Sequence, residues 1–274
     1  MPQFRERARI RPGSWGLIMS KLASINLLGI RVSALDLPGA TNRILDAVAA
    51  GERGYVCVTG AHGVVEAQRD ERLRTVHNDA FLVTPDGMPL VWALRGHGHR
   101  HCGRVYGPDL MADLIDRGRE RGLKHFLYGA TPATLQRLEA RLAERYPGVE
   151  IAGSWSPPFR PLSAGEDASV AKRIDASGAD IVWVGLGTPK QELWMARMRE
   201  RLRAPMLVGV GAAFDFHAGT LRQAPRFVQR SGFEWAFRLA CEPRRLWRRY
   251  AVTVPAFIGL NLAQMLRLRD FPTD

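Results

Sequence analysis

Short apolar runs alternate with longer segments of helical periodicity along most of this chain, from about Leu27 onward. This alternation is typical of a parallel sheet whose strands are connected by helices that pack on its faces. The apolar runs are continuous enough to be strands that are buried on both sides. They read YVCVTG (55–60), AFLVTP (80–85), HFLYGA (125–130), VEIAGS (149–154), DIVWVGLG (180–187) and PMLVGVG (205–211).

The segments between these runs have the features of helices. Each carries apolar residues at helical spacing, and a proline in the first turn or a glycine at the end marks its limits. We therefore predict a Rossmann-like α/β fold, in which helices cover both faces of a parallel sheet. The helical segments are PGATNRILDAVAAG (38–51), GPDLMADLIDRGRERG (107–122), TPATLQRLEARLAERYPG (131–148) and TPKQELWMARMRERL (188–202).

The length of 274 residues allows one large domain with a small addition. We predict a basic N-terminal extension over residues 1–26, an α/β domain over 27–231 and a helical, arginine-rich appendage over 232–274. The three cysteines are widely spaced and form no Cys-x-x-Cys pair. They indicate a reducing cytoplasm rather than a disulfide framework.

Positive charge is concentrated toward the C-terminus. The chain has 39 lysines and arginines against 27 acidic residues, a formal net charge of +12, and residues 222–249 contain eight of the arginines. Such charge suits nucleic acid, an anionic membrane or a phosphorylated ligand, and does not choose among them. Because the chain has no recognisable nucleic-acid-binding motif, we keep nucleic-acid binding only as an alternative, and expect no nucleic acid as partner.

An apolar run, AVTVPAFIGLNLAQML (251–266), follows the arginines directly. Its 16 residues include Pro255 and are fewer than the ~20 that are needed to cross a bilayer. We expect an interfacial helix that lies on a membrane beside the basic segment. The alternative is an ordinary C-terminal helix that packs on the core.

Small residues follow most of the predicted strands at the point where each strand ends. Glycine there lets a ligand approach the backbone, and the next helix offers free N–H groups to a phosphate. We expect a nucleotide at this edge of the sheet, near Gly129, Gly185 and Gly187; tight turns alone are the alternative. Neither Gly185-x-Gly187 nor Gly209-x-Gly211 has the third glycine of a dinucleotide fingerprint, so an NAD-linked oxidoreductase is weakly supported.

Asp86 stands just beyond a predicted buried strand, in the stretch TPDGMPLVW. A carboxylate at that place can accept a proton from a hydroxyl nucleophile. Aspartate is also a good N-cap, here for a helix that starts near Met88. Its position alone leaves both roles open.

Three alternating histidines, His97, His99 and His101, invite a metal interpretation. No acidic residue lies within their run, HGHRHC, and imidazoles that alternate along a loop need not converge. The chain has no Asp-x-Asp pair, and Asp215-x-His217 is the nearest arrangement to a divalent-cation site. We therefore expect no metal and no other cofactor.

Five stretches together resemble the WecG/TagA/CpsF family of bacterial glycosyltransferases in order and spacing, over about residues 27–250. The resemblance implies a metal-independent, inverting enzyme that moves a sugar from a UDP-sugar to a polyprenyl-diphosphate-linked saccharide, peripherally bound at the inner face of the cell membrane. The product would belong to a surface polysaccharide or exopolysaccharide. The five stretches are TPDGMPLVW, RVYGPDLM, VGLGTPKQELW, VGVGAAFDFHAG and QAPRFVQRSGFEWAFRLACEPRRLWRRY.

The resemblance also implies roles for single residues of the sheet domain. Asp86 is similar to the family's catalytic base, Thr59 to its partner on the first strand of the crevice, and Gln191 to a donor-site residue. Many members carry an asparagine shortly after the threonine, whereas this chain reads Thr59-Gly60-Ala61-His62. We expect His62 to take that place at the acceptor or sugar.

Arg238, Arg245 and Arg248 resemble the arginines that the family's C-terminal appendage brings to the diphosphate. They are seven and three residues apart, so on one continuous helix they would share a face. The arginine fork suits phosphate oxygens and keeps its charge at every physiological pH. The identity of the sugar, the acceptor and a homo-oligomeric state stay open.

Overall fold

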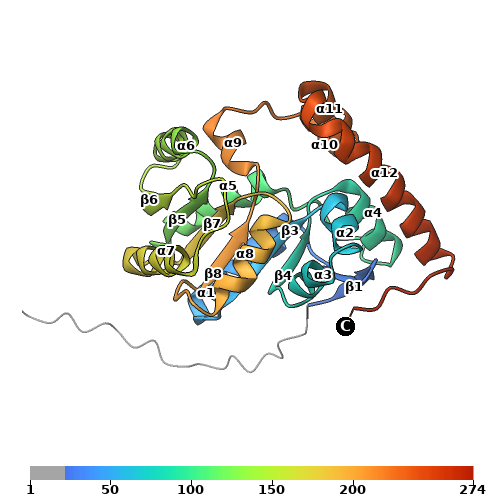
Figure 1. The fold of residues 1–274 in the computed structure, drawn as a ribbon, viewed down its shortest axis with the longest axis horizontal. Helices are drawn as coiled ribbons and strands as arrows, with labels where there is room; N and C mark the ends of the chain where they lie inside the picture. Colours follow the sequence, from blue (N-terminus) through green and yellow to red (C-terminus); the bar gives the residue numbers. More distant parts are fainter. Residues whose placement is uncertain (1–21, 274) are drawn as a thin grey trace, which may run out of the picture.

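The structure is a computed structural model that describes residues 22–273. Its centre is a six-stranded, all-parallel sheet in the order β4-β3-β8-β7-β5-β6 (Figure 1). All six predicted strands are confirmed. Their bounds are β3 (Gly54–Thr59), β4 (Leu82–Pro85), β5 (Lys124–Gly129), β6 (Glu150–Trp155), β7 (Ile181–Gly185) and β8 (Met206–Gly209).

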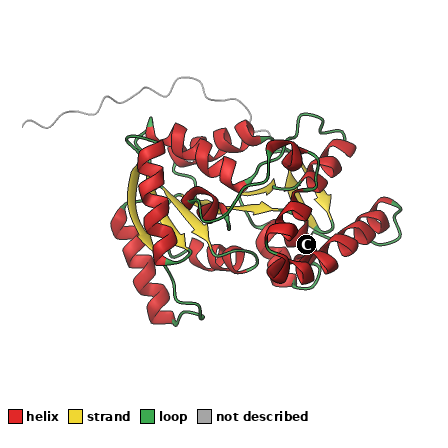
Figure 2. Cartoon of the chain, turned by 90° about the horizontal axis from the view of Figure 1, so that it is seen from above, coloured by secondary structure: helices red, strands yellow, loops and turns green. Residues whose placement is uncertain are grey.

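Helices cover both faces of this sheet, as predicted (Figure 2). One face is packed by α2 (Ala61–Ala67), α3 (Glu71–Asn78), α7 (Ala164–Ser177) and α8 (Lys190–Arg199). The opposite face is packed by α1 (Leu37–Ala50), α5 (Gly107–Arg119), α6 (Pro132–Arg145) and α9 (Ala213–Ala218).

The strand pleat explains why the strands are apolar without alternation. In β3, Tyr55 and Cys57 belong to the core of one face, whereas Val56 and Val58 belong to the core of the other. Side chains at successive positions point to opposite faces, so both sets need apolar residues. Strand β6 departs from this expectation: it is an edge strand, and its residues are only partly buried.

A short antiparallel hairpin, β1 (Ser24–Leu27) and β2 (Ile30–Ser33), stands beside the main sheet and was not predicted. Each of its strands has four residues, too few for a clear pattern. The hairpin overlaps the N-terminal extension expected over residues 1–26, most of which lies outside the described residues. Helix α4 (Met88–Gly96) buries Leu90 and Leu94 in the same core as the hairpin.

The C-terminal segment is helical, as predicted from residue 232 onward, and contains α11 (Glu234–Cys241) and α12 (Pro243–Met265). Helix α10 (Arg226–Arg230) precedes it, within the range predicted for the α/β domain. The chain turns between α11 and α12 at Glu242, where φ is −134° and ψ is 57°. Helix α12 then runs along α2 and buries Phe257 in the main core (Figure 1). Within residues 22–273, no helix combines the length and the apolar character needed to cross a membrane.

Candidate active site

A cavity of about 1190 Å³ opens at the carboxyl ends of the strands, beneath the C-terminal helices. Parallel strands of an open sheet place their carboxyl ends at one edge, where such proteins bind ligands. Four strand ends contribute to the wall: those of β3, β4, β7 and β8. The residues at or just after these strand ends that line the cavity include Gly60, Asp86, Gly87, Gly185, Gly187 and Gly211.

Gly129, expected near the donor, does not line this cavity. It ends β5, which lies on the far side of β7 from β8. Its φ is +133°, and a Cβ at this position would stand 2.6 Å from the backbone of Gly185. The structure therefore gives Gly129 a packing role, because two bare strand ends meet there.

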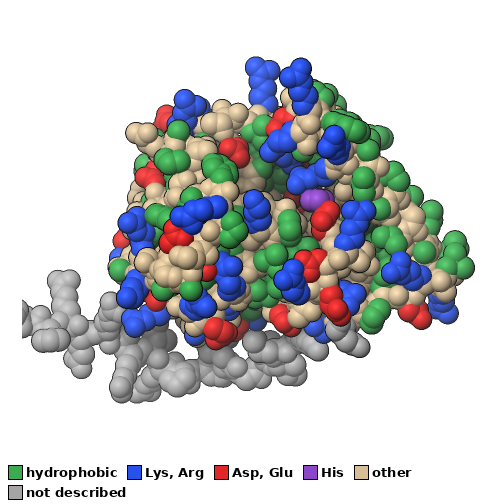
Figure 3. All heavy atoms as spheres, in the orientation of Figure 1, with side chains coloured by type: hydrophobic (Ala, Val, Ile, Leu, Met, Phe, Trp, Pro, Cys, Tyr) green, Lys and Arg blue, Asp and Glu red, His purple; other side chains and the backbone are tan. Residues whose placement is uncertain are grey.

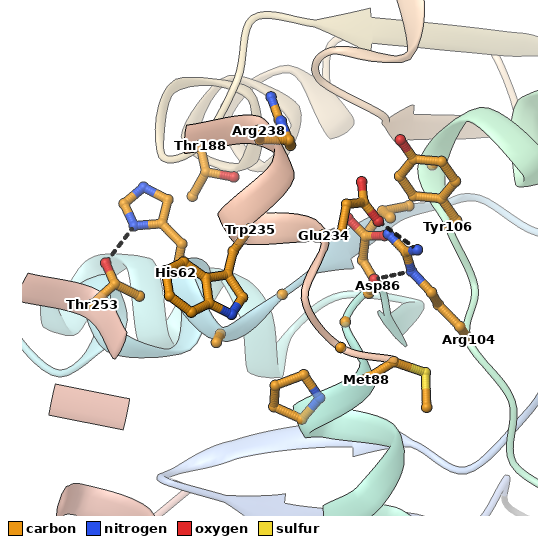
Figure 4. A pocket seen from close by; sticks show the side chains of 18 of the residues that line it. His62, Asp86, Met88, Arg104, Tyr106, Thr188, Glu234, Trp235, Arg238 and Thr253 are labelled. Atoms are coloured by element: carbon orange, nitrogen blue, oxygen red, sulfur yellow. Dashed lines mark hydrogen bonds and ion pairs between the residues drawn. The ribbon is translucent and has the colours of Figure 1, made fainter. Parts of the chain in front are cut away.

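Asp86 lies at the base of the cavity and does not cap a helix. The N-cap of α4 is Gly87, which makes no side-chain capping hydrogen bond. Arg104 holds the aspartate instead: its Nε donates to the backbone oxygen of Asp86 at 2.6 Å, and its Nη2 stands 3.5 Å from Oδ1. Figure 4 shows the Asp86 carboxyl group beside Arg104.

Glu234, from the first turn of α11, completes this charged cluster. Its Oε2 lies 2.6 Å from Nη1 of Arg104, and both side chains are largely buried. The pKa of Asp86 is raised to about 7, chiefly by burial. The positive charges of Arg104 and Arg238 lower this pKa, whereas the negative charge of Glu234 raises it. The Asp86 carboxyl group is therefore poised to gain or lose a proton near neutral pH.

Thr59 is buried beneath the cavity rather than exposed in it. Its hydroxyl lies 3.0 Å from Nε2 of His77 and 3.4 Å from the backbone oxygen of Cys57. The residues that line the cavity on either side of it are Val58 and Gly60. Thr59 therefore supports the strand end: its hydroxyl contacts His77, and its backbone oxygen accepts a hydrogen bond from the backbone N–H of Asp86 at 2.9 Å.

Two other predicted residues do reach the cavity. His62 lines it from α2 and lies 3.5 Å from the hydroxyl of Thr253 on α12 (Figure 4). Burial, with a contribution from Arg249, lowers the pKa of His62 to about 4, so this imidazole is neutral at physiological pH. Gln191 is buried at the wall, where its Oε1 accepts a hydrogen bond from the backbone N–H of Gly187 at 3.1 Å.

The three arginines expected at the diphosphate do not all reach the cavity. Arg238 and Arg245 line the cavity, but Arg248 does not: it is exposed, with its guanidinium 5.4 Å from the ring centre of Trp247. Arg249 lines the cavity in its place. The turn at Glu242 separates Arg238 from the helix that carries the other arginines, so the spacing along one continuous helix does not apply.

The three alternating histidines do not converge on a common point. Nδ1 of His97 bonds to the backbone oxygen of Ala93, and Nε2 of His101 bonds to that of Ala34. Within residues 22–273, no three histidine, cysteine, aspartate or glutamate side chains are grouped so that they could hold a metal ion.

Arg104, Glu234 and Arg249 are charged residues of the site that were not predicted from the sequence; Asp215, considered only for a cation, also lines the cavity. Arg104 opens the stretch RVYGPDLM, and Glu234 is one of only two acids among the arginines of residues 222–249. An acid within so basic a segment was the available signal for an internal ion pair. Nothing in the sequence indicated Arg104 as its partner.

Comparison with known proteins identifies a matching family and a relative, each over most of the chain. Residues 25–271 match a family described as the glycosyl transferase WecG/TagA/CpsF family. The chain is also 32% identical, over 193 residues, to an N-acetylglucosaminyldiphosphoundecaprenol N-acetyl-beta-D-mannosaminyltransferase of Bacillus spizizenii. That alignment covers 70% of this chain and 72% of the relative.

Proposed function

The chain belongs to the WecG/TagA/CpsF family of glycosyltransferases, and we propose that it transfers a sugar from a UDP-sugar to a saccharide carried on a polyprenyl diphosphate. The name of the relative from Bacillus spizizenii supports this acceptor class, because it describes transfer to a sugar on diphosphoundecaprenol. Family membership leaves the alternatives, nucleic-acid binding and NAD-linked oxidoreduction, without support. The product is a longer lipid-linked saccharide, which serves the assembly of a surface polysaccharide or exopolysaccharide.

Asp86 acts as the general base of the transfer. Its carboxylate accepts the proton of the acceptor hydroxyl while the hydroxyl oxygen attacks the anomeric carbon of the donor. The bond between that carbon and the nucleoside diphosphate breaks, and a single displacement inverts the configuration. A carboxyl group whose pKa is about 7 suits this task at neutral pH.

Arginines stabilise the leaving nucleoside diphosphate. Arg238 and Arg249 line the cavity, and neither forms an ion pair with an acidic residue among those described. Arg245 also lines the cavity, with an exposed ion pair to Glu242. Their fixed positive charge neutralises the diphosphate as it departs, so the mechanism requires no metal ion. Glycines Gly185 and Gly187 allow the donor to approach the backbone.

The protein works at the inner face of the cell membrane, where its lipid-linked acceptor is held. The C-terminal segment supports this placement: α12 and the residues after it carry exposed Leu262, Met265, Leu266 and Leu268 near several arginines. Apolar side chains beside cations are typical of an interfacial helix.

The single observation that carries this proposal is the position of Asp86 in the cavity beside Arg104. We expect Asp86→Asn to lower kcat by roughly 10²- to 10⁴-fold, because the amide cannot accept the proton. Donor binding, measured by calorimetry with the UDP-sugar, should persist. The control Asp46→Asn changes an exposed aspartate on α1 and should be neutral. A kcat near that of the wild type in Asp86→Asn would refute the role of Asp86.

A further inference from the structure

The cavity has a second, apolar part that the transfer reaction does not use. One of its walls is Trp92 on α4, and the other is formed by Ile258, Leu262 and Met265 on α12. The three α12 residues follow the spacing i, i+4, i+7, which places them on one face of the helix. We call this part the α4–α12 groove.

The walls of the α4–α12 groove are apolar and yet accessible. The exposed fractions are 52% for Trp92, 53% for Ile258, 51% for Leu262 and 68% for Met265. Single exposed apolar residues are ordinary on a protein surface, but here they line one continuous cavity. Phe257, which also lines the cavity, is buried and fixes α12 on the core.

The groove is continuous with the charged site. Helix α4 begins at Met88, two residues after Asp86, and carries Trp92 one turn further along. Thr253 and Arg249, which precede Ile258 on α12, line the charged part of the same cavity. A ligand that fills the whole cavity therefore needs an anionic, hydrogen-bonding end and an apolar chain.

The outer end of the groove has the side chains of a membrane-facing surface. Beyond Met265, Leu266 and Leu268 are 66% and 76% exposed, and they alternate with the exposed Arg267 and Arg269. Figure 3 shows apolar side chains along the edge of the molecule where α12 runs in Figure 1. An apolar chain that leaves the groove here would pass directly into a lipid bilayer.

We propose that the α4–α12 groove binds the isoprenoid units next to the diphosphate of the acceptor. The inference rests on the proposed function and adds a binding subsite for the lipid. The acceptor saccharide lies at Asp86, and the chain runs between Trp92 and Leu262 toward the membrane. Burial of the chain against these side chains supplies binding free energy that a water-soluble acceptor lacks.

The test uses the full-length protein in detergent and two acceptors with the same saccharide diphosphate, one with a polyprenyl chain and one with a short alkyl group. In the double variant Ile258→Asn/Leu262→Asn, we expect kcat/KM for the polyprenyl acceptor to fall about tenfold or more. The value for the short acceptor should not change. The matched control is Val252→Asn, because Val252 is 45% exposed on the same helix and does not line the cavity.

Other occupants of the groove predict different results. The proposal would be overturned if the double variant lost kcat/KM equally with both acceptors, or if it kept the wild-type preference for the polyprenyl acceptor. It would also be overturned if Val252→Asn lowered kcat/KM as much as the double variant does. A shift in oligomeric state of the double variant, measured by sedimentation, would show that the groove holds a second copy instead. Loss of binding to anionic vesicles without any change in detergent would assign it to bilayer lipid.

A binding measurement separates this proposal from the proposed function. Calorimetry in detergent with a polyprenyl diphosphate that carries no saccharide should give binding to the wild type and about tenfold weaker binding to the double variant. Inorganic diphosphate should bind both proteins equally. If the wild type transfers no sugar and still shows this difference in binding, the proposed function is refuted and the proposed lipid subsite is supported. If sugar is transferred and the difference in binding is absent, only the proposed lipid subsite is refuted.

Discussion

Asp86, Arg104 and Glu234 form a charged cluster in which Arg104 lies between the two acidic side chains. Arg104 contacts both acids, at 3.5 Å from Asp86 and 2.6 Å from Glu234. Asp86 follows β4 of the sheet, whereas Glu234 comes from the C-terminal segment. The protonation state of Asp86 therefore depends on a residue of α11.

The activity should depend on pH through Asp86. The carboxyl group must be unprotonated to accept the acceptor proton, and its pKa is about 7. We expect kcat/KM to rise with pH up to about this value and then to level off. Glu234→Gln removes a negative neighbour and frees Arg104 for Asp86; both changes lower the pKa of Asp86. The rising limb of the variant should therefore lie at lower pH.

The measurement is a pH profile of kcat/KM for the wild type and Glu234→Gln, each scaled to its own plateau. Glu144→Gln serves as the control, because Glu144 is exposed on α6, away from the cavity. An unchanged limb would show that Glu234 does not act on Asp86, and a limb moved to higher pH would contradict the expected sign of its effect. A merely structural role of Glu234 would lower the plateau without moving the limb.

At the scale of elements, the direction of α12 decides which arginines serve the site. Arg248 and Arg249 are neighbours in the sequence, but successive residues of a helix point about 100° apart. Arg249 lines the cavity, whereas Arg248 lies beside Trp247 on the outside. These two positions provide a matched pair of identical side chains on one helix.

We expect Arg249→Ala to lower kcat/KM by about 10²-fold, a typical effect of removing one group that stabilises developing charge. Arg248→Ala should change kcat/KM less than about threefold, because that side chain is exposed and screened. Steady-state kinetics with the polyprenyl-linked acceptor compares the two variants. Equal losses would mean that the arginines act through a general electrostatic field rather than by position.

At the scale of the whole molecule, the two ends of the described chain are joined. Phe271 is buried in the same core as the β1–β2 hairpin, and Nδ2 of Asn26 donates to its backbone oxygen at 2.7 Å. Gln264, near the end of α12, accepts a hydrogen bond from the backbone N–H of Leu28 at 3.0 Å. The C-terminal segment is thus anchored to the β1–β2 hairpin by residues near and beyond the end of α12.

We expect Phe271→Ala to lower the free energy of unfolding by about 3 kcal/mol, because it removes a large buried side chain and leaves a cavity. Phe159→Ala is the control: that ring is 92% exposed, and its loss should change stability by no more than about 0.5 kcal/mol. Urea unfolding compares both with the wild type. Equal stability of the two variants would mean that residues after α12 do not anchor the segment.

The sequence by itself determined the strands of the main sheet, the helices α1, α5, α6 and α8 that pack on it, and the edge of the sheet that carries the site. Burial on both faces forces continuous apolar strands, and helical periodicity is local, so both are readable along the chain. Asp86 and Gly185 were found for the same reason, because a residue that follows a parallel strand must stand at the ligand edge. The hairpin escaped detection because four-residue strands carry too little pattern.

Only the tertiary structure decided which residues meet. Strand order placed Gly129 beyond β7, outside the cavity, although it ends its strand as Gly185 does. The turn at Glu242 brought Arg249 to the cavity and turned Arg248 away. The pairing of Arg104 with Glu234 joins segments far apart in the sequence. Local periodicity fixes the face of each element, whereas the contacts between elements depend on their packing, which no single segment specifies.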